Sequence, residues 1–178
     1  MNIGNVLFSP NGRIGQQDYW VGILIIIVGN IVGGMIPFLG LIITLGLIYV
    51  GVCVYGKRLH DIGKTAWIHG IVWLIQFGLG IVAFVMAGGA VMAALSAGGT
   101  EEAGVAAAIA ASGSLFLIGG LGFLIWIVYT IWLGVSVGEA GANRFGPPPG
   151  AAEPAPAAPA QPSQPAPPQD DNNPTISS

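Results

Sequence analysis

The stretch Lys57-Arg58-Leu59-His60-Asp61-Ile62-Gly63-Lys64-Thr65-Ala66-Trp67 decides the fold. It holds three of the chain's five basic residues and one of its two histidines, and long apolar runs flank it on both sides. A dense group of charges between two such runs is typical of a membrane-surface loop that connects two spanning helices. The sequence therefore predicts an all-α membrane protein arranged around this loop.

The composition excludes a soluble globular protein. Of the 178 residues, 53% are hydrophobic and only 7% are charged, whereas soluble domains have roughly 25% charged residues. Because so few charges cannot cover a surface that faces water, lipid must be the solvent for most of the chain. The single cysteine, Cys53, lies inside an apolar run. It excludes a disulfide within the chain and a cysteine metal cluster, and it favours a packing role.

Four apolar segments are long enough, at about 1.5 Å per residue, to cross the ~30 Å hydrocarbon core. They are residues 19–36, 38–56, 66–86 and 115–137. We predict that they form a four-helix transmembrane bundle within a domain of residues 19–146, after a polar lead of residues 1–18. We expect the first span to be retained, because one basic residue precedes it and no Ala-x-Ala cleavage site follows it.

The segment between the third and fourth spans, residues 87–113, is rich in Ala and Gly and has Thr100-Glu101-Glu102 near its centre. It fits a loop with a short helix, and it equally fits an extension of the two flanking helices. The sequence does not decide between these alternatives.

Residues 147–178 contain eleven of the thirteen prolines and almost no large apolar side chain. Such a segment cannot bury a core, so we expect a disordered, polyproline-like tail. Its charged residues are all acidic, so anionic headgroups repel it and it projects into water. A solvated tail and a ligand for an unknown protein partner are the two interpretations of this segment.

The charges also predict an orientation. With four spans, all five basic residues fall on one side of the membrane, and the two opposite connections carry only acidic charges. Basic residues near spanning helices stay cytoplasmic, so the sequence predicts a multi-pass protein with both termini in the cytoplasm. We expect an aromatic belt at the cytoplasmic interface, formed by Tyr19, Trp20, Tyr55 and Trp67.

This topology returns three polar segments to one membrane surface. Their charged and amide side chains form what we call the charged cluster: Arg13, Asp18, Arg58, His60, Asp61, Glu139, Asn143 and Arg144. Three arginines at one surface repel one another unless an acid or an anion lies among them, so we predict that Asp61 contacts at least one of them. We also predict that residues 143–145 dock against the loop of residues 57–64.

The charged cluster has three interpretations. As a structural clasp, which we favour, it ties the three segments together through ion pairs and hydrogen bonds. As an anion site, its arginines bind a lipid headgroup or another anion. As a catalytic site, Asp61 orients His60 as a base, but no nucleophile accompanies the pair. His60 and His69 match no strong metal-ligand spacing, so we expect no metal and no cofactor.

Three polar side chains lie deep in the predicted spans: Asn30, Thr44 and Gln76. Each is about 15–17 Å from the interface, near the bilayer midplane. We predict a midplane polar layer in which at least one pair hydrogen-bonds between helices. A water-lined path is the alternative. The sequence has no ionisable residue deeper than His69, which argues against a proton-coupled pump but not against a passive pore.

Three motifs carry a resemblance to a known family. They are Phe8-Ser9-Pro10-Asn11-Gly12-Arg13-Ile14-Gly15 before Tyr19-Trp20, Lys57-Arg58-Leu59-His60-Asp61 before Trp67, and Asn143-Arg144-Phe145-Gly146-Pro147 with Pro149. In order and spacing over residues 7–149, the chain resembles the YhaH-like family of small bacterial inner-membrane proteins, a domain of unknown function. The resemblance implies a location in the bacterial inner (plasma) membrane and implies no activity.

We therefore expect a non-enzymatic structural or interaction protein whose charged cluster contacts a partner or a headgroup. Gly29-x-x-x-Gly33 and Gly134-x-x-x-Gly138 permit close helix approach, within one bundle or, as an alternative, in a homo-oligomer. The expected partners are the lipid bilayer and, as alternatives, an anionic lipid headgroup, a second copy of the chain or a protein that binds the tail. Nothing points to nucleic acid. A small oligomeric transporter or pore is the second interpretation, and an enzyme is the third.

Overall fold

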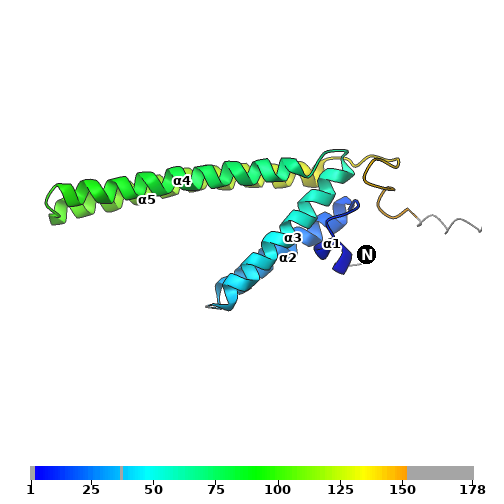
Figure 1. Cartoon of the computed structure of the whole chain (residues 1–178), viewed down its shortest axis with the longest axis horizontal. Coiled ribbons are helices and arrows are strands. Elements are labelled where there is room, and N and C mark those ends of the chain that lie inside the picture. Colours follow the sequence, from blue (N-terminus) through cyan, green and yellow to red (C-terminus); the bar gives the residue numbers. More distant parts are fainter. Residues whose placement is uncertain (1–2, 37, 152–178) are drawn as a thin grey trace, which may run out of the picture.

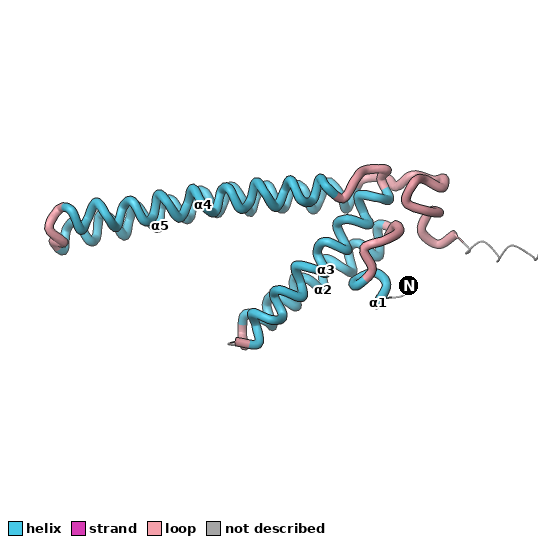
Figure 2. The backbone as a smooth tube through the Cα atoms, in the orientation of Figure 1, coloured by secondary structure: helices cyan, strands magenta, loops and turns pink. Residues whose placement is uncertain are grey.

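The computed structural model describes residues 3–36 and 38–151. These residues form five helices and no strand (Figures 1 and 2): α1 Ile3–Phe8, α2 Gln16–Gly34, α3 Leu39–Asp61, α4 Trp67–Ser96 and α5 Glu101–Val135. The four helices from α2 to α5 are each long and apolar enough to cross a membrane. The predicted all-α fold with four spans is therefore confirmed. The predicted disorder of the tail concerns residues that lie, from 152 onward, outside the described part of the chain.

The spanning helices pair as two antiparallel hairpins, α2 with α3 and α4 with α5. Figure 1 shows that the hairpins meet at one end, where the loop of residues 62–66 and the segment after α5 also lie, and diverge towards their tips. The two hairpins thus meet at one end and separate towards the other. We call the end where they meet the closed end of the molecule.

Close backbone approach explains why α2 and α3 stay together. A Cβ added to Gly22 would lie 2.9 Å from the methyl groups of Val54, and one added to Gly29 would lie 3.0 Å from those of Leu47. Because lipid tails are as apolar as leucine, helices in a bilayer associate through such packing instead of through the hydrophobic effect. The small residues of α2 therefore pack within the chain.

The Ala/Gly-rich residues 87–113 extend both helices of the second hairpin, so α4 has 30 residues and α5 has 35. The turn between them uses Gly98 and Gly99, with φ of 87° and 63°, which favour glycine. Thr100 then caps α5, since its hydroxyl accepts a hydrogen bond from the Ala103 amide at 3.3 Å. At about 1.5 Å per residue α5 is about 52 Å long, so this hairpin must tilt strongly or protrude from a ~30 Å core.

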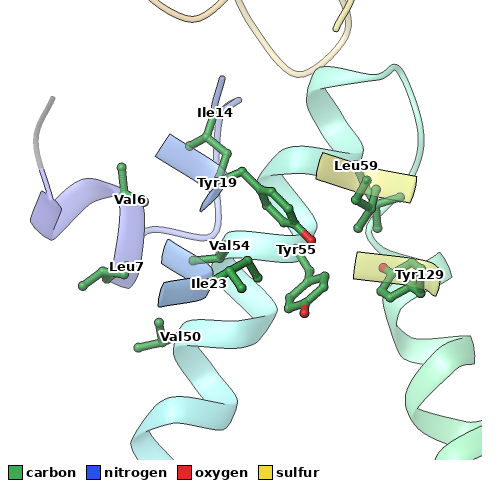
Figure 3. Close-up of a cluster of buried hydrophobic side chains, with 11 residues drawn as sticks. Val6, Leu7, Ile14, Tyr19, Ile23, Val50, Val54, Tyr55, Leu59 and Tyr129 are labelled. Carbon is green, nitrogen blue, oxygen red and sulfur yellow. The ribbon is translucent and has the colours of Figure 1, made fainter. Parts of the chain in front are cut away.

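The buried core lies at the closed end (Figure 3). The Tyr55 ring stacks on the Tyr129 ring with centroids 5.5 Å apart. The Tyr19 ring lies perpendicular to the Tyr55 ring, with centroids 5.7 Å apart. Thr130 of α5 joins the second hairpin to the first. The Tyr19 hydroxyl donates to its carbonyl at 3.0 Å, and the Tyr55 and Thr130 hydroxyls are 2.8 Å apart. Tyr19 and Tyr55 are therefore core residues, and the expected aromatic belt is wrong for them. Trp67, by contrast, is 80% exposed.

We predict that Gly40→Ala destabilises the first hairpin. A Cβ on Gly40 would overlap the carbonyl oxygen of Gly33, a backbone atom that cannot move without shifting a helix. The expected loss is about 1–3 kcal/mol of unfolding free energy, as for other overpacking changes. Denaturation in detergent, followed by far-UV circular dichroism, measures it.

The matched control is Gly46→Ala on the same helix, where a Cβ meets nothing within 4 Å. It should leave stability unchanged or raise it by up to about 1 kcal/mol, because alanine favours helix over glycine. Equal stabilities of the two variants would contradict the packing described for this hairpin.

Candidate functional site

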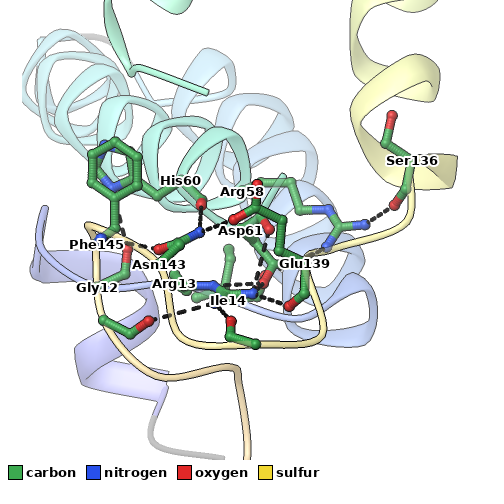
Figure 4. A network of polar contacts seen from close by, with 12 residues as sticks. Gly12, Arg13, Ile14, Arg58, His60, Asp61, Ser136, Glu139, Asn143 and Phe145 are labelled. Atoms are coloured by element: carbon green, nitrogen blue, oxygen red, sulfur yellow. Dashed lines mark hydrogen bonds and ion pairs between the residues drawn. The ribbon is translucent and has the colours of Figure 1, made fainter. Parts of the chain in front are cut away.

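The charged cluster is organised around Asp61, the last residue of α3 (Figure 4). One carboxylate oxygen accepts hydrogen bonds from Arg13 Nε at 3.1 Å and Nη2 at 3.0 Å. The other accepts from Arg58 Nη1 at 2.5 Å. Asp61 is 3% exposed and Arg58 is 1% exposed. The structure therefore contains a buried triad in which Arg13 and Arg58 share the Asp61 carboxylate. The predicted contact between Asp61 and at least one arginine is present, and two arginines make it.

Backbone carbonyls take most of the remaining donors of the two guanidinium groups. Arg58 donates to the carbonyls of Leu133, at 3.0 Å, and Ser136. Arg13 donates to the carbonyls of Gly141, at 2.7 Å, and Glu139. Arg58 thus reaches the C-terminal end of α5, where carbonyls lack helical partners and a cation is favourable.

The segment after α5 docks on the end of α3. The Asn143 side-chain amide donates to the His60 carbonyl at 3.0 Å and to Glu139 Oε2 at 2.6 Å. The Phe145 ring stacks on His60 with centroids 3.8 Å apart and ring planes 8° apart. His60 Nδ1 also donates to the Gly12 carbonyl at 3.2 Å. The predicted approach of residues 143–145 to the 57–64 loop is therefore present.

Two members of the charged cluster lie outside the Asp61 network. Asp18 is in the first turn of α2 and forms no ion pair within residues 3–36 and 38–151. Arg144 is exposed, and its guanidinium lies over the Phe145 ring, 4.6 Å from the centroid.

The predicted cluster left out two residues that the structure places at the closed end. One is Lys57, which is 1% exposed and donates to the Asn5 carbonyl. The other is Gln16, which donates to the Gly134 carbonyl at 2.6 Å.

Comparison with known proteins places this arrangement in a family. The sequence profile described as "Protein of unknown function (DUF805)" matches residues 7–147. The chain belongs to the DUF805 family. The matched range contains the whole charged cluster and all four spanning helices, and it ends where the proline-rich tail begins. No curated protein and no solved structure matches the chain.

The Asp61 carboxylate and the His60 ring have different partners in this DUF805 protein. The Asp61 carboxylate accepts from arginines, whereas the His60 ring donates to the Gly12 carbonyl and stacks on Phe145. Within the described residues, no group of three His, Cys, Asp or Glu side chains is placed to hold a metal ion. The arrangement can bind charges and fix loops, and within the described residues no carboxylate hydrogen-bonds the His60 ring.

His69 belongs to the core of the closed end. The Trp73 indole donates to its Nε2 at 3.0 Å, so in the neutral imidazole Nδ1 carries the proton and faces the Tyr129 hydroxyl at 3.3 Å. Its ring also stacks on Tyr55 at 4.6 Å. Both ring nitrogens are thus engaged by neighbouring aromatic side chains.

The predicted midplane polar layer is only partly assembled. Asn30 donates to the Ile26 carbonyl of its own helix, and Gln76 donates to the Gly122 carbonyl, both at 2.9 Å. In the part of the chain that the structure describes, no hydrogen bond joins Asn30, Thr44 and Gln76 to one another, so the predicted pairing is not formed. The reason is the divergence of the hairpins, which leaves a cavity of about 380 Å³ that all three residues line.

We predict that Asp61→Asn lowers stability strongly. The change leaves Arg13 and Arg58 buried without their shared counter-charge, and breaking a buried ion pair in this way costs about 3–5 kcal/mol. Thermal unfolding of the full chain in detergent should show a clearly lower Tm.

Asp18→Asn is the matched control, because Asp18 is an acid of the same cluster with no ion-pair partner among the described residues. Asp18→Asn should shift the Tm no more than an ordinary surface substitution does. If Asp61→Asn and Asp18→Asn shift the Tm equally, the triad does not stabilise the protein.

Proposed function

We propose that this DUF805 protein is a non-enzymatic structural or interaction protein of the bacterial inner membrane, with both termini in the cytoplasm. The single observation that supports it is the buried triad, in which the Asp61 carboxylate is shared by Arg13 and Arg58. The charged cluster then acts as a clasp, because its strongest donors bind the protein itself.

The arginine contacts support the clasp over catalysis or anion binding at the triad. A site for an external anion needs guanidinium donors that point to open space. Here the donors of Arg13 and Arg58 point to Asp61 and to carbonyls of residues 133–146. The bonds join the chain before α2, the end of α3 and the chain after α5, so they connect the first hairpin to the second.

The distribution of charge supports the orientation. All five basic residues belong to the lead, the loop before α4 and its adjoining helix end, or the segment after α5. Glu101 and Glu102 begin α5 at the opposite tip. Under the positive-inside rule the closed end faces the cytoplasm. The narrower resemblance to the YhaH-like proteins supports the inner membrane as the location.

A small oligomeric pore is the second candidate, and the shared cavity of Asn30, Thr44 and Gln76 favours it. The cavity lies between diverging hairpins, so a pore requires further copies of the chain to close its open side. Such a pore is passive, since the cavity-lining polar residues at this depth carry no carboxylate or basic amine.

We predict that single cysteines at Ser9 and Ser163, each in a Cys53→Ala background, resist an impermeant thiol reagent in whole cells. A cysteine at Ala97, in the turn between α4 and α5, should be labelled under the same conditions, because the proposed topology puts that turn outside the cytoplasm. Lysed cells, in which all three should react, are the control for thiol access. Labelling of either terminal position in intact cells would exclude the proposed orientation.

A further inference from the structure

A second feature of the closed end is a groove that the clasp does not explain. The cavity of about 380 Å³ between the hairpins shares Ile48, His69 and Trp73 with a neighbouring cavity of about 500 Å³. This neighbour reaches the loop before α4, where Thr65 and Trp67 line it. The two cavities therefore form one groove along α3 and α4, from the midplane to the membrane surface. We call it the α3–α4 groove.

The walls of the α3–α4 groove suit a hydrocarbon chain. Its lining includes the apolar side chains of Ile48, Val52, Val72 and Trp73. Of these, Ile48, Val52 and Trp73 are 38%, 44% and 45% exposed. At its deep end the amides of Asn30 and Gln76 already donate to helix carbonyls. A hydrocarbon chain at this depth therefore meets no free amide donor from Asn30 or Gln76, although Gln76 Oε1 is buried without a hydrogen-bond partner among the described residues.

Two exposed cations that form no ion pair in the described residues, Lys64 and Arg144, lie near the surface end of the groove, and the Glu139 carboxylate lies beside Gly63 of the same loop. His60 lines this end, Phe145 stacks on His60, and the Arg144 guanidinium covers Phe145. Lys64 follows in the loop, where its backbone amide donates to the Leu59 carbonyl at 2.8 Å. Both cations are exposed, and neither forms an ion pair in the described residues, whose salt bridges are those of Asp61.

We propose that the α3–α4 groove binds an anionic phospholipid. One acyl chain lies between Ile48, Val52 and Trp73, and the phosphate lies at the membrane surface, where Lys64 and Arg144 attract it. An apolar groove that ends at two unpaired cations matches a molecule with a hydrocarbon chain and an anionic head. The Arg13–Asp61–Arg58 triad takes no part, since its donors are used within the protein.

Charge distinguishes this occupant from a second copy of the chain. A symmetric dimer across the groove would bring the Lys64 and Arg144 side chains of two copies to one interface, where like charges repel. An anionic headgroup neutralises the same charges. The bilayer also supplies the lipid at high local concentration along the whole exposed length of the groove.

The test is native mass spectrometry of the full chain in mild detergent, titrated with phosphatidylglycerol or with phosphatidylcholine of the same acyl chains. The natural sequence should bind one lipid with a preference for phosphatidylglycerol. Each basic residue near an anionic surface contributes about fivefold, so Lys64→Gln combined with Arg144→Gln should reduce binding of phosphatidylglycerol about 30-fold and leave phosphatidylcholine unchanged. Lys64→Arg with Arg144→Lys should keep the preference.

Two further variants fill the groove. Gly51 and Gly70 line it, and an added Cβ meets nothing within 4 Å at Gly51 and only Trp67 at 3.8 Å at Gly70. Gly51→Leu and Gly70→Leu should each weaken both lipids at least tenfold. Gly46→Leu, on the same helix as Gly51 and also in open space but not in the groove wall, is the control and should bind lipid as the natural sequence does.

Three results would overturn the proposal. They are an unchanged preference in the Lys64→Gln, Arg144→Gln variant, equal lipid binding by Gly51→Leu, Gly70→Leu and Gly46→Leu, and a lipid-free dimer as the dominant species. Lipid binding in the groove rests on the membrane location given under the proposed function. It does not depend on the charged cluster acting as a clasp. A failure of the clasp would appear as an unchanged Tm in Asp61→Asn, whereas a failure of the groove would appear only in the lipid titrations.

Discussion

The structure depends on one carboxylate, that of Asp61, held between two buried guanidinium groups. Near the membrane surface the effective dielectric lies between those of water and hydrocarbon, so a close ion pair contributes more than it does on a soluble protein. Because the groups are buried, removing either the carboxylate or a guanidinium leaves an unpaired buried charge, which is strongly destabilising. Because Arg13 precedes α2 and Arg58 also bonds the end of α5, this charge balance couples the first hairpin to the second.

The clasp also explains why the molecule is closed at one end and open at the other. Apolar helices gain little by associating in lipid unless their backbones approach closely or polar groups join them. Close approach holds α2 against α3, and polar contacts join the hairpins at Thr130 and in the charged cluster. Farther from the closed end the hairpins share no such contacts in the described residues, and they diverge (Figure 1).

The sequence predicted the four spans and the convergence of the charged cluster, because both follow from long-range composition. Apolar runs locate the spans, and an even number of them returns the lead, the 57–67 stretch and Asn143 to one side. It could not predict which donors would meet which acceptors. Lys57 and Gln16 bond backbone carbonyls, and a carbonyl's position is set by the fold and not by residue type. Arg144 was expected with the other arginines, yet it lies over Phe145.

Residues 87–113 and the midplane residues were undetermined for a related reason. Alanine favours helix and glycine favours turns, so a segment that mixes the two does not decide between helix and loop. The structure resolves it as two helices, joined by the Gly98–Gly99 turn and the Thr100 cap. Depth alone put Asn30 and Gln76 at one level, but depth carries no information on the angle between hairpins. That angle leaves the cavity which they line.

The most direct test of the clasp is a distance measurement between the hairpins by double electron–electron resonance. Spin labels at Leu41, near the tip of the first hairpin, and at Ala97, at the tip of the second, report their separation in a Cys53→Ala background. If Asp61 holds the hairpins together, the labelled protein with Asp61 intact gives one narrow distance distribution. The same protein with Asp61→Asn gives a broad one. Identical distributions with and without the Asp61 carboxylate would contradict the account.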